Sequence, residues 1–178
     1  MDLWRGESPT INPEAFHALF VEWAPQFAGS SQEDCHEFVV KLIEAFQESE
    51  PSMFQQLFFG TFRTSIECAA CSRDTLHFDP FSCMSLPIPV PNSTCTLCDC
   101  FKQLIIPQSL EVWTCPRCNQ STSACTNMSV SVSAWPIILI IHFKRFTASG
   151  EKITTNIAFP LHGLVLDDSP TYDLVGLS

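Results

Sequence analysis

The chain has 178 residues, 46% of them hydrophobic, which is enough to bury a core as one domain with a projecting subdomain. Its formal net charge of -10 argues against a nucleic-acid partner, because modules that bind phosphate backbones carry clustered Lys and Arg. No apolar run reaches the roughly 20 residues of a membrane span, and the N-terminus does not read as a signal peptide. We therefore expect a soluble intracellular protein, cytoplasmic, nuclear or both. Its acidic surface either favours a basic protein partner or serves only solubility.

Two amphipathic helices are predicted in the first third of the chain. Asn12 and Pro13 form a helix start, as N-cap and first helical residue, ahead of apolar residues at helical spacing. Ser31 is predicted to cap a second helix, with Asp34 three residues later as in a capping box. The buried face of this second helix is expected to contain Cys35, Phe38, Val39, Leu42 and Phe46.

From Thr61 onward the apolar period changes to two, which predicts strands. A first strand leads into Cys68, and 76–81 is expected to return beside it. Three prolines exclude a central strand over 86–91 and leave an edge or connecting segment. Residues 101–110 form at most a short helix. Further strands are predicted at 128–132, 137–146, 152–160 and 172–177, of which 137–146 is expected to be fully buried.

Four cysteines are predicted to hold one structural zinc ion. Cys68 with Cys71, and Cys115 with Cys118, have the spacing of a zinc knuckle, and each pair adjoins a strand-like segment. Knuckles at the ends of neighbouring strands can face one another. Four thiolates leave no open position for water, so the zinc would be structural. Its binding energy, roughly 10 to 16 kcal/mol, would then become folding energy.

Other sets of zinc ligands remain open at this point. Cys95 and Cys98 form a third pair, with Cys100 just beyond it, so three pairs permit three tetrads. These three cysteines precede a short amphipathic stretch, which is why the other two pairs are preferred. The alternative without metal leaves ordinary buried or surface thiols.

Four stretches form a specific set through their order and spacing. They are GSSQEDCHEF at 29–38, the first knuckle at 59–71, MSLPIP at 84–89, and PIILIIHFKRF at 136–146 followed by Lys-Ile and Phe-Pro. Together they resemble the helix-opening motif, the first zinc knuckle, the Leu-Ser-Leu-Pro-Ile-Pro segment and the palm strand of the ubiquitin-specific protease family. The resemblance covers nearly the whole chain.

The resemblance implies an α+β fold of papain-like thumb, palm and fingers, incomplete in this chain, with a zinc-ribbon-like fingers subdomain. We expect a helical thumb-like part at 1–58, zinc-binding fingers at 59–134 and truncated palm-like strands at 135–178. In such a fold the fingers grip ubiquitin, and the ubiquitin tail enters a cleft between thumb and palm. Ubiquitin or ubiquitinated proteins are the implied partners.

Three polar residues at the start of the second helix are implied to contact the ubiquitin tail: Gln32, Asp34 and Glu37. The tail is rich in arginine, and carboxylates on one flank of a helix suit guanidinium groups. Asp34 also fits a purely structural role in the capping box, and the two roles are compatible.

No catalytic residue is assigned within the chain. The family uses a papain-like cysteine, a histidine base and an Asp or Asn, and both catalytic boxes are expected to lie outside this sequence. Cys35 and His36 are consecutive, and helical neighbours point about 100° apart, so they are not expected to act as a pair. Burial is further expected to keep Cys35 inert. His142 is predicted to be a satisfied core histidine, and no partner is recognisable for His17, His77 or His162.

Three functions follow from these features. The first is the core of a cysteine-type deubiquitinase, whose complete form hydrolyses isopeptide bonds after the C-terminal Gly of ubiquitin while this chain alone is inactive. The second is a catalytically inactive ubiquitin-binding or scaffold protein. The third is a structural zinc module with an unrelated protein partner, which predicts no affinity for ubiquitin.

Overall fold

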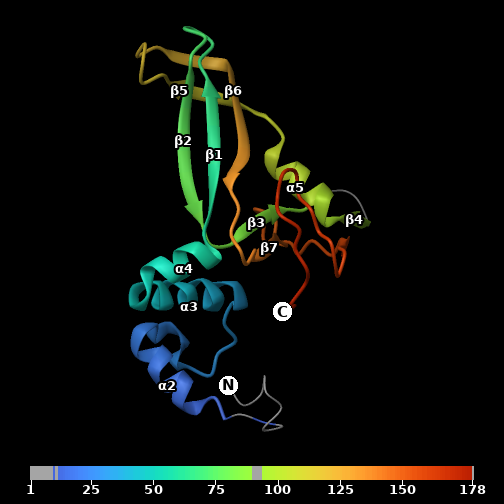
Figure 1. Ribbon diagram of the computed structural model, residues 1–178. Coiled ribbons are helices and arrows are strands. Elements are labelled where there is room, and N and C mark those ends of the chain that lie inside the picture. The colour runs from blue at the N-terminus through green and yellow to red at the C-terminus, as the bar shows by residue number, and fades with distance from the viewer. Residues whose placement is uncertain (1–9, 11, 90–93, 178) are drawn as a thin grey trace. The chain divides into compact units, whose positions relative to one another are not determined.

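The computed structural model describes residues 10, 12–89 and 94–177, and the chain divides into two compact units. The first unit is Met1–Pro51 and the second is Ser52–Ser178 (Figure 1). The expected division into thumb-like, fingers and palm-like parts stays a prediction. Within the described residues, no helix combines the length and apolar character that a membrane span requires.

The first unit is built on two α-helices around a small aromatic core. Helix α2 spans Glu14–Trp23, the short 3-10 helix η1 spans Pro25–Ala28, and α3 spans Cys35–Ser49. The predicted start of the first helix is wrong by one residue, because Pro13 is the N-cap and Glu14 the first helical residue. The Asn12 side chain accepts a hydrogen bond from the backbone N–H of Glu14 at 2.9 Å, one position before the cap. Phe20 is buried, and Phe38 of α3 meets its ring edge-on with centroids 4.9 Å apart.

The start of α3 differs from the prediction. Asp34, not Ser31, is the N-cap, because its carboxylate accepts hydrogen bonds from the backbone N–H groups of His36 and Glu37 at 2.7 and 3.4 Å. Cys35 is therefore the first helical residue, lies beyond the aromatic core and is exposed, so its predicted burial is wrong. Phe46 is 42% exposed as well, and Ile43 is the residue of α3 that is buried.

The second unit contains all but the first residue of helix α4 (Pro51–Phe58) and continues into a four-stranded antiparallel sheet. Its strands are β1 (Gly60–Glu67), β2 (Asp74–Phe81), β5 (Gln108–Thr114) and β6 (Ser121–Ala134), in the order β2-β1-β6-β5. The predicted return of 76–81 beside the first strand is confirmed. Alternating side chains give this sheet one face with apolar residues of β1 and β6.

Two small parallel sheets and one helix complete the second unit. Strand β3 (Met84–Pro87) pairs with β7 (Ile141–Lys144), and β4 (Thr94–Thr96) pairs with β8 (Asn156–Ala158). Helix α5 (Leu97–Ile105) follows β4 directly. Because β3 has one strand partner and ends at Pro87, the start of the proline-rich segment is an edge strand, as its prolines predict. Residues 90 and 91 of that prediction lie outside the described part of the chain.

Four strand and helix predictions are wrong in extent. Only Ile141–Lys144 of the segment 137–146 is a strand. Ile137 and Phe146 are 66% and 65% exposed, so the segment is not fully buried as predicted. The small two-stranded sheet covers less of this segment than a wide sheet would. The helix expected within 101–110 starts earlier, since Thr96 and Asp99 form a capping box. Of the strand predicted at 152–160, only Asn156–Ala158 is a strand, and Lys152 forms an isolated bridge. An isolated bridge of Tyr172 likewise takes the place of the strand predicted at 172–177.

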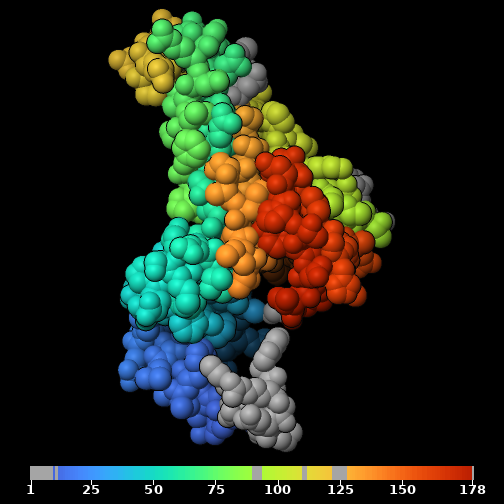
Figure 2. Space-filling model, viewed as in Figure 1, coloured from blue at the N-terminus to red at the C-terminus, as the bar shows by residue number. Residues whose placement is uncertain are grey.

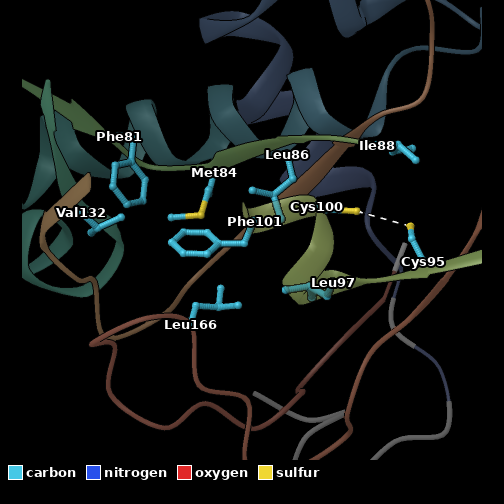
Figure 3. Packing of buried hydrophobic residues seen from close by; sticks show 10 residues of the cluster. All are labelled: Phe81, Met84, Leu86, Ile88, Cys95, Leu97, Cys100, Phe101, Val132 and Leu166. Atoms are coloured by element: carbon cyan, nitrogen blue, oxygen red, sulfur yellow. Dashed lines mark hydrogen bonds between the residues drawn. The ribbon is translucent and has the colours of Figure 1, made fainter. Parts of the chain in front are cut away.

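The core of the second unit lies where β3, α5 and the C-terminal segment meet (Figure 3). Met84, Leu86 and Cys100 are fully buried, and Leu166 from the C-terminal segment is 1% exposed. Figure 2 shows this segment (red) closed against α5 (yellow-green) and β6 (orange). Burying each large apolar side chain contributes about 1.5 to 3 kcal/mol, so this cluster is what joins the sheet to the C-terminal segment.

Candidate metal centre and acidic helix start

Two cysteine knuckles are built in the same way at two strand connections. In the first, the N–H of Ser72 donates to the Cys68 carbonyl at 2.7 Å, and the N–H of Cys68 donates to the Arg73 carbonyl at 3.0 Å. In the second, Asn119 donates to the Cys115 carbonyl at 2.9 Å. Both turns therefore close through a residue four positions after the first cysteine, and that residue has a left-handed backbone.

That left-handed residue was not anticipated from the sequence. Ser72 has φ of 52° and Asn119 has φ of 55°. Asn is among the residues that most readily adopt this conformation, so Asn119 is the sequence signal that could have indicated the turn. The conformation turns the chain back so that both cysteines of each pair point to the same side.

The sheet brings the two knuckles together. The first follows β1, the second precedes β6, and these strands are antiparallel neighbours with Glu67 opposite Asn127. The four sulfur atoms lie within 4.8 Å of one another, and the Sγ atoms of Cys68 and Cys118 are 3.9 Å apart. Tetrahedral zinc with Zn–S bonds of about 2.3 Å separates its sulfurs by roughly 3.8 Å. The donor set and its spacing thus fit a structural zinc ion.

The local environment shifts the pKa values of the knuckle thiols in opposite directions. Backbone N–H groups, that of Cys118 first, lower the pKa of Cys115 to about 7, whereas desolvation raises the pKa of Cys71 to about 11. Close thiols cannot all ionise without a cation between them. Because metal ligation requires thiolates, a bound dication would supply the charge that such an arrangement needs.

The other cysteines of the described chain do not form a comparable group. Within the part of the chain that the structure describes, the four knuckle cysteines are the one set of three or more metal-ligating side chains close enough to share an ion. Cys95 and Cys100 lie with their sulfurs 3.7 Å apart, on either side of the capping box of α5. They occupy the two positions of a hydrophobic staple, a contact that fixes the direction of the chain as it passes from β4 into α5.

Three histidines have polar neighbours. His17 Nε2 lies 3.2 Å from the Phe27 carbonyl, and His162 Nδ1 lies 3.6 Å from a carboxylate oxygen of Asp173, so the expectation that these two lack partners is wrong. His142 is half-buried, with Nδ1 3.4 Å from the Ser85 hydroxyl.

Comparison with known proteins identifies the family. The profile of the ubiquitin carboxyl-terminal hydrolase family matches residues 1–176. The chain belongs to this family. It is 27% identical to human ubiquitin carboxyl-terminal hydrolase 21 over 241 aligned residues, which covers 98% of this chain and 42% of the relative. It is 30% identical to chicken ubiquitin carboxyl-terminal hydrolase 2, covering 92% of this chain and 57% of the relative. The chain thus spans about half the length of these relatives.

Solved structures support the fold. A chain of the SAGA DUB module, composed of Ubp8, Sgf11, Sus1 and Sgf73 and bound to monoubiquitin, matches with a TM-score of 0.62 and 24% identity. The match covers 80% of this chain and 35% of that one. The module bound to ubiquitin aldehyde gives a TM-score of 0.60 at 23% identity, with coverages of 80% and 34%. The fold is therefore the mixed helix and sheet fold of the ubiquitin-specific proteases, as expected.

Within this family member, the predicted tail-binding residues gather at the start of α3. Gln32 and Asp34 precede the helix, Glu37 lies in its first turn, and all three are exposed. One carboxylate oxygen of Asp34 accepts the capping hydrogen bonds, and this leaves its second oxygen for another donor. The charge at this helix start is thus available to an arginine side chain while the cap remains intact.

Proposed function

We propose that this chain is the ubiquitin-binding core of a cysteine-type deubiquitinase, whose complete form hydrolyses the isopeptide bond after the C-terminal Gly of ubiquitin. The observation that carries the proposal is the family match over residues 1–176. The convergence of the two cysteine knuckles at one end of the sheet supports it. An intracellular location, cytoplasmic or nuclear, belongs to the proposal, because thiolate ligands persist in reducing compartments.

Zinc is proposed as the structural cofactor, held by Cys68, Cys71, Cys115 and Cys118. The ion would fix the ends of β1 and β6, a region whose burial comes mainly from the cysteines themselves. It would bind no substrate, since all four positions are taken by protein sulfur.

The Gln32, Asp34 and Glu37 side chains are proposed to bind the ubiquitin tail. Both carboxylates are exposed at the helix start, where guanidinium groups can form paired hydrogen bonds with them. The chain by itself is proposed to bind ubiquitin without turnover. Cys35, the exposed cysteine of α3, is followed on the helix by His36, whose side chain points about 100° away.

The test is titration of the zinc-loaded chain with ubiquitin, together with an assay on a fluorogenic ubiquitin C-terminal substrate. The variant carries Asp34→Asn and Glu37→Gln, because Asn caps a helix as well as Asp does and only the charge is lost. The matched control carries Glu14→Gln and Glu22→Gln, which removes the same charge from α2. We expect at least tenfold weaker binding for the first variant and less than threefold change for the control, with no turnover by any of them.

Each result has a distinct meaning. Equal weakening in both variants would refute tail binding at the helix start in favour of general attraction by acidic groups. Turnover that Cys35→Ser abolishes would refute the proposal that this chain is inactive. A folded, zinc-loaded chain that does not bind ubiquitin would refute the ubiquitin-binding core and leave a structural zinc module with another partner.

A further inference from the structure

An open cleft lies in the first unit, at the end of α3 opposite to the helix start. It has a volume of about 420 Å³ and is lined by Trp23, Glu44, Gln47, Glu48 and Pro51. An indole ring and a proline ring supply flat apolar walls. Glu44 and Glu48 stand one helical turn apart, so their carboxylates lie on the same side of α3.

Two of the residues that line the cleft, Trp23 and Glu44, already hold a cation. The Nζ atom of Lys41 lies 5.7 Å from the centroid of the Trp23 ring and 2.8 Å from a carboxylate oxygen of Glu44. The ammonium group is therefore held by the face of the indole and by one carboxylate together. This contact also raises the pKa of Lys41, chiefly through its hydrogen bond with Glu44.

Among the described residues, no basic side chain forms an ion pair with the second carboxylate, that of Glu48. Glu48 accepts a hydrogen bond from the indole N–H of Trp23 at 3.4 Å, which is long and comes from a neutral donor. Lys41 pairs with Glu44 and His162 with Asp173, and Glu48 belongs to neither pair. The charge balance of the surroundings does not compensate it, because residues 1–51 contain ten of the 19 acidic residues and two of the nine basic ones.

We propose that this cleft binds an arginine side chain from a basic segment of a partner protein. A planar guanidinium group can stack on the indole and donate to Glu48, and it offers donors to Glu44 beside Lys41. A neutral side chain would leave the Glu48 charge unpaired. The site is separate from the helix start, since Glu44 and Glu48 follow Glu37 by seven and eleven residues, roughly 10 and 16 Å along the axis.

The probe is a fluorescein-labelled octapeptide of alternating Arg and Gly, compared with the same peptide containing citrulline, which has the shape of arginine without its charge. Binding to the zinc-loaded 178-residue chain is followed by fluorescence anisotropy at physiological salt. The test variant carries Glu44→Gln and Glu48→Gln. The matched control carries Glu14→Gln and Glu22→Gln, which removes the same charge elsewhere in the unit. All peptide titrations use chains that also carry Asp34→Asn and Glu37→Gln, so that the proposed tail-binding residues do not contribute to the binding of arginine.

We expect the arginine peptide to bind at least tenfold more tightly than the citrulline peptide, and the cleft variant to lose at least tenfold in affinity. The matched control variant should lose less than threefold. The indole N–H resonance of Trp23, assigned by its absence in Trp23→Phe, should shift on titration and saturate with the same Kd.

Three results would overturn the proposal: no preference for arginine over citrulline, equal losses in the cleft and control variants, or a Trp23 resonance that stays unmoved at saturation. Ubiquitin binding that survives Glu44→Gln and Glu48→Gln in a chain with Asp34 and Glu37 intact would show that this outcome and the proposed function are independent. Glu→Gln exchanges keep side-chain size, and an unchanged circular dichroism spectrum confirms that the variants remain folded.

Discussion

Replacing Gly60 with alanine tests how tightly the sheet packs on its aromatic core. Gly60 opens β1 directly opposite Phe81 of β2. A Cβ atom at this position would lie 2.4 Å from Cζ of the Phe81 ring and 2.8 Å from the carbonyl oxygen of Ala134 in β6. The ring cannot simply move away, because it is 8% exposed and stacks on Phe62 with centroids 4.2 Å apart.

The magnitude follows from two opposing terms. Overpacking a closed core costs about 1 to 3 kcal/mol, whereas replacing Gly with Ala restricts the unfolded chain and returns about 0.4 to 1 kcal/mol. We expect a net destabilisation of about 1 to 2 kcal/mol, which corresponds to roughly 5- to 30-fold more opening of the strand. Phe81→Leu removes the ring atoms that the new Cβ meets. The double variant should therefore lose at least about 1 kcal/mol less than the sum of the two single variants.

The assay is amide hydrogen exchange in β1 and β6 of the zinc-loaded chain, which reports on the sheet without requiring both units to unfold together. Gly176→Ala is the matched control, since nothing lies within 4 Å of its added Cβ. Exchange in Gly60→Ala that equals or is slower than that of the unmodified chain would refute the close packing described here. Strictly additive losses in the double variant would show that Phe81 is not the obstacle.

Two further predictions concern the knuckles and α5. Cys71→Ser should lower the zinc content measured by plasma mass spectrometry and speed exchange at the ends of β1 and β6, whereas Cys83→Ser, outside the four-sulfur group, should do neither. Hydrogen bonds from Thr96 lower the pKa of Asp99 in the folded chain. The cap therefore stabilises α5 fully at pH values above the pKa of Asp in the unfolded chain. This stabilisation is lost as the pH falls through the lower pKa of Asp99 in the folded chain. Asp99→Asn should thus speed exchange in α5 at pH 6, and the difference from the unmodified chain should vanish at strongly acidic pH. An equal difference at both pH values would contradict this assignment.

Local patterns determined much of the second unit. The alternation after Thr61 predicted β1 and the return of β2, because each side chain of a strand repeats its environment two residues later. The prolines predicted an edge strand, because they lack the N–H group that a central strand must donate. Cys-x-x-Cys spacing identified the knuckles, because two residues between the cysteines let one turn present both sulfurs.

The tertiary structure decided what depends on residues far apart in the chain. Spacing alone allowed Cys95 and Cys98 into the metal site. The pairing of β1 with β6 placed Cys115 and Cys118 against the first knuckle instead, while Cys95 became part of the start of α5. Apolar composition suggested a buried strand at 137–146, but burial requires neighbours on both faces, and Ile137 is 66% exposed.

The same holds for the first unit. The sequence placed Asp34 near a helix start but left open whether Asp34 or Ser31 is the N-cap. The structure identifies Asp34, because its carboxylate accepts hydrogen bonds from two backbone N–H groups of the first turn. Nothing in the sequence connects Trp23 with Glu48, which lie 25 residues apart and meet because α2 and α3 pack through Phe20 and Phe38. Short-range periodicity and turn chemistry are encoded within a few residues, whereas a site shared by two elements exists only after their packing has fixed their separation.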